Sequence, residues 1–148
     1  MGIRRASLAD LEGVFELLVE AHTESDNYSR LPYNKVRVMA AFKGWLQNPK
    51  VLFIVSEGLD GIDGVIIGEV TTAWFHDGMM AITHAIYARP GTAGLRLVKE
   101  FLAWARSWKA VRKIQISVSF AGERGERSSK LFERLGLNRV GFEFTEVL

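Results

Sequence analysis

The sequence predicts a mixed α/β (α+β) fold built on a central, mostly antiparallel sheet. Three apolar segments at 51–57, 65–75 and 79–88 follow one another with only short turn sequences between them, which is typical of an antiparallel meander. An amphipathic helix separates the third segment from a further strand-like segment at 113–120, and a β-α-β unit of this kind makes its two strands parallel. With 148 residues, the chain is expected to form a single domain over 1–148.

The first part of the chain is predicted to form one short strand and two helices. Residues 2–6 have the composition of a strand. Ser7 can cap the helix that follows, with Asp10 in its first turn, where a negative charge suits the helix N-terminus. Asn34 can cap a second helix, which the Asn-Pro pair at 48–49 would end.

Glycine-rich turns separate the three central strands. We expect turns at 58–64 and 76–78. Gly68 lies inside the second strand, which indicates a β-bulge or a close approach of another backbone segment.

The second part of the chain continues the alternation of helices and strands. A helix is expected from about Thr92 to Trp108, and another over 126–136 with Gly136 as its stop signal. A last strand is expected at 139–147. The predicted order contains six strands and four helices.

Composition excludes several classes of protein. The chain has no cysteine, so it has neither disulfides nor a thiolate nucleophile, and we expect a cytoplasmic protein. Its apolar runs are too short to span a membrane, and its few histidines lack the spacing of metal ligands. The formal net charge of +2 comes with scattered arginines, so we expect no nucleic-acid partner. From the short apolar runs and the histidine spacing we expect no membrane partner and no metal.

A run of small residues precedes the helix that begins near Thr92. Gly91, Thr92, Ala93 and Gly94 would let a ligand approach the backbone closely. Because the free N–H groups of a helix N-terminus favour anions, this stretch has the properties of a pyrophosphate site. A tight strand-to-helix turn without a ligand would have the same composition, so both interpretations stay open.

The chain resembles the GNAT superfamily of acetyl-CoA-dependent N-acetyltransferases over nearly its whole length. The resemblance rests on "GTAGLRLVK" at 91–99, on Trp104-Ala105, on "LFERLGL" at 131–137 and on the opening "IRRASLADLEGVFELL". It implies a sheet of six to seven strands flanked by about four helices, with acetyl-CoA as cosubstrate. The residues that the resemblance assigns to acetyl-CoA are Ile86, Ala88, Arg89, Gly91, Thr92, Ala93, Gly94, Leu95, Arg96 and Phe132.

The phosphate-binding loop departs from the family pattern Q/R-x-x-G-x-G/A. Without a gap, Arg89, Thr92 and Gly94 fill its three defined places, and Thr92 replaces a glycine. Alternatively, Ala88 to Pro90 match the "V-x-P" that ends the preceding strand, and the loop is then about three residues shorter than usual and lacks its own arginine.

Two residues are candidates for the base that deprotonates an amine. In the family, the strand before the loop pairs with the pantetheine arm, which the resemblance assigns to Ile86 and Ala88. His84 can take up a proton near neutral pH, and strand alternation would put it on the same face as Ala88. Glu69 is the second candidate, because a carboxylate within "VIIGEV" must be paired or open to a cleft. An ordinary partly buried histidine and an outward-facing glutamate are the alternatives.

The usual general acid is missing. The resemblance implies a tyrosine in the last helix as proton donor to the departing thiolate, and Phe132 occupies that position. Ser119 or solvent could replace it.

The loop at 22–34 is expected to bound the acceptor site. Tyr28, Arg30 and Tyr33 are the candidate substrate-binding residues, although their side chains could also serve only to pack a long loop. The four tryptophans, Trp45 among them, are expected in the core or an interface.

The resemblance thus implies an enzyme that transfers an acetyl group to the primary amine of a small molecule or protein by direct attack in a ternary complex. A catalytically degenerate module that binds an acyl-CoA or a protein is the alternative. Dimers are common in the family, and the predicted last strand offers an edge through which a homodimer could form.

Overall fold

The computed structural model describes residues 2–120 and 122–148. The chain divides into two compact units. The first comprises the residues up to Leu18 together with Asn34–Ile116, and the second comprises Val19–Tyr33 and Ser117–Leu148. The prediction of one domain stays a prediction.

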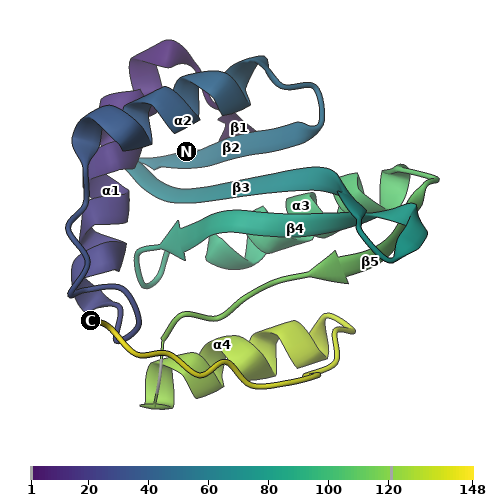
Figure 1. Ribbon diagram of the computed structural model, residues 1–148. Helices are drawn as coiled ribbons and strands as arrows, with labels where there is room; N and C mark the ends of the chain where they lie inside the picture. The colour runs from purple at the N-terminus through teal and green to yellow at the C-terminus, as the bar shows by residue number, and fades with distance from the viewer. Residues whose placement is uncertain (1, 121) are drawn as a thin grey trace. The chain divides into compact units, whose positions relative to one another are not determined.

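The first unit contains a five-stranded sheet in the order β1-β2-β3-β4-β5 (Figure 1). Its strands, which are antiparallel except for the parallel pair β4 and β5, are β1 (Ile3–Arg5), β2 (Val51–Gly58), β3 (Gly61–Ala73), β4 (His76–Ala88) and β5 (Val111–Gln115). The antiparallel meander and the parallel β-α-β unit are therefore confirmed.

Helices cover both faces of this sheet. They are α2 (Lys35–Gln47), α3 (Gly94–Ser107) and the start of α1 (Leu11–Glu24), which a 3₁₀ turn at Leu8–Asp10 precedes. Phe42 of α2 packs edge-to-face on Phe53 of β2. On the opposite face, the buried ring of Phe101 in α3 packs on Gly68 of β3. Asn34 caps α2 by accepting the N–H of Arg37, as expected.

The second unit contains the end of α1 and the helix α4 (Gly122–Arg134). Ser25 ties its segments together, because the Ser25 hydroxyl donates to the carbonyl of Ser119 at 3.1 Å and accepts the N–H groups of Asn27 and Tyr28. Gly136, with a φ of +93°, follows the helix as the predicted stop signal.

Four predictions about strands are wrong. The turn after β2 occupies 59–60 rather than 58–64, since Gly58 pairs with Gly61. The tight turn is at Trp74–Phe75 rather than 76–78, since Ala73 pairs with His76. The strand expected at 113–120 ends at Gln115, where its pairing with β4 stops. Residues 139–147 are not a strand, because no other strand of the described chain pairs with them. The sheet has five strands instead of six to seven for this last reason.

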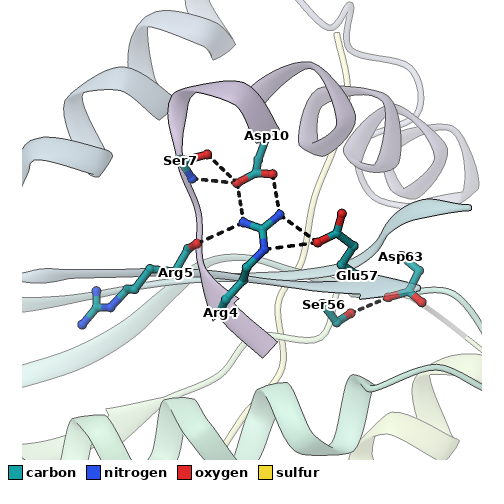
Figure 2. Close-up of polar contacts among 7 residues, drawn as sticks. All are labelled: Arg4, Arg5, Ser7, Asp10, Ser56, Glu57 and Asp63. Carbon is teal, nitrogen blue, oxygen red and sulfur yellow. Dashed lines mark hydrogen bonds and ion pairs between the residues drawn. The ribbon is translucent and has the colours of Figure 1, made fainter. Parts of the chain in front are cut away.

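An ion-pair network links β1 to the 3₁₀ turn that precedes α1 (Figure 2). The Arg4 guanidinium donates two hydrogen bonds to the Asp10 carboxylate, at 2.7 and 2.8 Å, and also contacts Glu57 of β2 at 3.0 Å. Asp10 is only 9% exposed and also accepts the N–H of Ser7 at 2.7 Å, which confirms Ser7 and Asp10 as the start of the helix. The Arg4 guanidinium holds the pKa of the Asp10 carboxyl well below its ordinary value.

We expect the stability contributed by Asp10 to disappear in acid. Because its folded-state pKa is lowered, this contribution is complete above the unfolded pKa of about 4 and declines as the pH falls below it. Asp10→Asn should lower the free energy of unfolding by about 2 kcal/mol at pH 7 and by less at pH 3, as measured by urea denaturation. The exposed Asp77→Asn is the control, and an equal loss at both pH values would contradict the prediction.

A second prediction concerns the contact between Gly68 and α3. A Cβ on Gly68 would collide with the Phe101 ring and lie 3.3 Å from the carbonyl oxygen of Ile82. Gly68→Ala should therefore destabilise the protein by about 1–3 kcal/mol. Gly44→Ala in α2, where no atom lies within 4 Å, should instead be neutral or stabilising. Equal midpoints of thermal unfolding for the two variants would contradict this.

Candidate active site

The second half of β4 has an open edge. β4 pairs with β3 over its whole length, but its pairing with β5 ends at Ile82 and Gln115. From Thr83 to Ala88, no described strand pairs with the edge of β4 that β5 occupies further back along the strand (Figure 1).

The backbone groups of Ile86 and Ala88 face this open edge. The Arg89 N–H donates to the Asp63 carbonyl at 2.9 Å, and Ala88 pairs with Gly64. In an antiparallel ladder, hydrogen-bonded pairs alternate with pairs that point their N–H and C=O groups outward. Arg89 is therefore turned toward β3, whereas Ala88 and Ile86 are turned away from it. A ligand with amide groups could add to this edge as a strand would.

A β-bulge separates the two halves of β4. Ile67 pairs with Ala85 and Gly68 pairs with Thr83, so His84 is the extra residue of the bulge. The bulge expected at Gly68 is confirmed, and the group that approaches this glycine closely is the Phe101 side chain rather than a further backbone segment. The prediction that His84 and Ala88 share a face is wrong, because the extra residue reverses the alternation.

His84 and Glu69 form a hydrogen-bonded pair on the face that carries α2. His84 Nε2 lies 2.5 Å from Glu69 Oε2, and each side chain is 26% exposed. Since a carboxylate can only accept, the Nε2–H of His84 donates and Nδ1 is the nitrogen that can take up a proton. The two candidate bases are thus hydrogen-bonded to each other.

Trp45 of α2 completes this group and was not predicted as a site residue. Its indole stacks on the His84 imidazole with ring centroids 4.6 Å apart and planes 15° apart. The helical pattern around Trp45 indicated a core position, and only the bulge at His84 brings the two rings together. No signal in the sequence marks that contact.

The N-terminus of α3 follows the open edge directly. Five residues, Arg89–Ala93, connect Ala88 to the first residue of the helix. Gly91 has a φ of +77°, and Thr92 closes the turn by donating its hydroxyl to the Arg89 carbonyl at 2.6 Å. Ala93 is the N-cap and supplies no side-chain acceptor, nor does the first turn contain an acidic residue.

These features leave backbone donors at the helix start. By helix geometry, the N–H groups of Gly94, Leu95 and Arg96 have no acceptor within the helix. The Arg96 side chain adds a positive charge in this first turn. A Cβ on Gly94 would lie 3.1 Å from that of Ala88, so the helix start packs tightly on the end of β4. Such an N-terminus can bind a phosphate group.

The remaining predicted residues belong to the second unit, and their roles stay predictions. Tyr33 stacks on His22 with ring centroids 4.5 Å apart, and burial raises the pKa of its hydroxyl above the ordinary value. The Phe132 carbonyl accepts the N–H of Leu137 at the end of α4. The other three are Tyr28, Arg30 and Ser119.

No group of three or more His, Cys, Asp or Glu side chains in residues 2–120 and 122–148 is arranged to hold a metal ion. Within the same residues, no helix has the length and apolar character needed to cross a bilayer.

Comparison with solved structures identifies the fold. A putative acetyltransferase from Agrobacterium tumefaciens superimposes with a TM-score of 0.72 at 18% identity, and covers 99% of this chain and 100% of its own. The glucosamine-6-phosphate N-acetyltransferase of Arabidopsis thaliana gives 0.73 at 13% identity, covering 99% and 97%. The chain has the GNAT fold.

The similarity is one of structure rather than of sequence. A transcriptional regulator from Bacillus halodurans gives a TM-score of 0.75 at 18% identity, covering 99% of both chains. The sequence matches no family model and no curated protein. At these identities the GNAT fold is shared, and the chemistry must be argued from the site.

The pairing of His84 with Glu69 predicts one tautomer. We expect the neutral imidazole of His84 to carry its proton on Nε2, and its ring protons to be shifted upfield by the Trp45 indole. Long-range ¹H–¹⁵N correlation spectra measure the tautomer. In Trp45→Leu the ring protons should move downfield while the rest of the sheet keeps its signals. A proton on Nδ1, or unchanged shifts in the variant, would contradict this geometry.

Proposed function

We propose that the chain is an acetyl-CoA-dependent N-acetyltransferase that acts on a primary amine of a small molecule or protein. The observation that carries this proposal is the open edge of β4, with the outward backbone groups of Ile86 and Ala88, next to the uncapped N-terminus of α3. Names of structural neighbours, among them acetyltransferases, add support at the level of the fold.

The residues fit the two ends of acetyl-CoA, which would supply the activated acetyl group. The N–H groups of Gly94, Leu95 and Arg96 would bind the pyrophosphate. The outward N–H and C=O groups of Ile86 and Ala88 would pair with the amides of the pantetheine arm. An N–H at this edge would also stabilise negative charge on the thioester oxygen during attack.

His84 and Glu69 would remove the proton that the attacking ammonium must lose. Nδ1 of His84 would accept this proton, directly or through a water. Glu69 would hold the ring by its Nε2–H and stabilise the positive charge that the imidazole gains, as the carboxylate does in other His-carboxylate pairs. Trp45 would fix the plane of the ring by stacking on it.

Phe132 supports the second candidate, a module that binds an acyl-CoA without turnover. A phenyl ring cannot donate a proton to the departing thiolate. Solvent or Ser119 would then have to take this role, or the step would be left without an acid.

Calorimetric titration with acetyl-CoA tests the proposal. We expect micromolar binding by the parent protein and loss of binding in Gly94→Arg, whose side chain would fill the helix start. Gly44→Arg introduces the same charge on α2, where no atom lies within 4 Å of the new Cβ, and should bind as the parent does. No binding by the parent at millimolar acetyl-CoA would reject the proposal.

Kinetics with a panel of amines form the second arm of this experiment. His84→Ala should lower kcat by about 10²–10⁴-fold with acetyl-CoA binding unchanged. Glu69→Gln should have a smaller effect, and His76→Ala at the far end of β4 should have none. Binding of acetyl-CoA without acetylation of any amine would favour the module instead.

A further inference from the structure

The turn between β3 and β4 exposes two large aromatic side chains, which we call the aromatic tip. Trp74 is 95% exposed and Phe75 is 65% exposed, and their rings meet edge-to-face with centroids 5.4 Å apart. A single exposed apolar side chain, such as Leu59 in the turn between β2 and β3, is normal on a protein surface. Two adjacent aromatic rings that project into solvent instead indicate a surface that binds a partner.

The aromatic tip has cationic neighbours in the same unit of the chain. The connection from α3 to β5 lies beside the start of β4, because the Met79 N–H donates to the Ala110 carbonyl at 2.8 Å (Figure 1). Lys109 and Arg112 are exposed on this connection and at the start of β5. A Cβ on Gly78 would lie 2.6 Å from Cγ of Arg112, so the arginine side chain runs along the base of the hairpin.

The positive charge at this end of the sheet is not balanced by nearby carboxylates. Residues 101–122 contain no aspartate or glutamate and four cations, which are Arg106, Lys109, Arg112 and Lys113. Arg106 lies in the last turn of α3, where the helix dipole favours a cation. Within the described part of the chain, the other three form no salt bridge. Asp77 is the one carboxylate in residues 73–78, so the surface is positive overall.

This surface lies at the end of β4 that is remote from the candidate active site. β4 begins at His76, next to the aromatic tip, and ends at Ala88. Its 13 residues span about 40 Å at the usual rise of a strand. A partner bound at the aromatic tip would therefore leave the open edge of β4 and the start of α3 accessible.

We propose that the aromatic tip and the three cations Lys109, Arg112 and Lys113 dock the protein on an anionic lipid bilayer. The two rings would enter the headgroup region, where aromatic side chains are favoured, and the cations would lie over acidic headgroups. Apolar burial and attraction to anionic lipids together determine the strength of such surface binding. The expectation of no membrane partner concerned segments that span a bilayer, whereas this contact lies on its surface.

Single-stranded nucleic acid is the other partner that combines aromatic rings with cations. Its bases stack in succession on ring faces that lie along a basic groove. Here both rings belong to one two-residue turn and contact each other edge-to-face, so they form one projecting tip rather than a row. A bilayer accepts a projecting tip without a complementary pocket, and the geometry therefore favours the lipid surface.

Co-sedimentation with vesicles tests this proposal. The parent protein should bind vesicles of phosphatidylcholine mixed with phosphatidylserine, but not vesicles of phosphatidylcholine alone. Trp74→Ser with Phe75→Ser should lower the partition coefficient by about tenfold or more, because the apolar contact is lost. Changing Lys109, Arg112 and Lys113 to glutamine should lower it by about fivefold for each cation removed.

Matched variants elsewhere in the first unit serve as controls. Leu59→Ser removes an apolar side chain that is 90% exposed in the other two-residue turn. Arg37→Gln with Lys43→Gln removes two exposed cations from α2. Both variants should bind the acidic vesicles as the parent does, and circular dichroism shows that every variant is folded.

Tryptophan fluorescence determines whether the aromatic tip itself enters the bilayer. Acidic vesicles should shift the emission of the parent to shorter wavelength, and Trp74→Phe should remove this shift while the protein still binds. Equal binding to both kinds of vesicle, unchanged binding in the serine variant, or a shift that persists in Trp74→Phe would overturn the proposal. Binding of a single-stranded oligonucleotide without binding of acidic vesicles would also overturn it.

Discussion

The β-bulge between β3 and β4 is the constraint on which the candidate site depends. At this point the Phe101 ring occupies the space that a side chain on Gly68 would fill, and β4 accommodates one extra residue, His84. The bulge turns the His84 side chain toward Glu69 on the face of α2. It also makes Ile86 present its backbone groups to the open edge of the sheet. One local irregularity therefore sets the geometry of both the candidate acid–base pair and the open edge proposed for the ligand.

The two halves of the proposed chemistry are supported from opposite faces of one sheet. α3 covers one face and begins five residues after β4 ends, and its first residue, Gly94, packs tightly against the Ala88 side chain. α2 covers the other face and supplies the indole that stacks on His84. A rigid strand between two packed helices is a suitable support for a site of this kind, because neither side can shift without disturbing the core.

Most of the first unit could be predicted from sequence, and the site could be predicted only in part. Alternation and turn residues indicated the meander, and Gly68 indicated the bulge. The pairing of Glu69 with His84 was not predicted, since a bulge changes which residues share a face and its register cannot be read from a glycine alone. The prediction of a strand at 139–147 was wrong for a physical reason. Alternating apolar and polar residues indicate only that a segment can form a strand, and a strand also needs the edge of a neighbouring strand to pair with. Trp74 and Phe75 form a turn that turn propensities disfavour.

The bulge also makes the length of β4 more constrained than its composition. Side chains along a strand can be exchanged one at a time, and each exchange has a local effect. Removing the extra residue would leave each half of β4 paired with β3 as it is now, because Thr83 pairs with Gly68 and Ala85 with Ile67. What would be lost is the position from which an imidazole reaches Glu69 and stacks on Trp45. A one-residue deletion at this place during evolution could therefore remove the candidate acid–base pair while the sheet persisted.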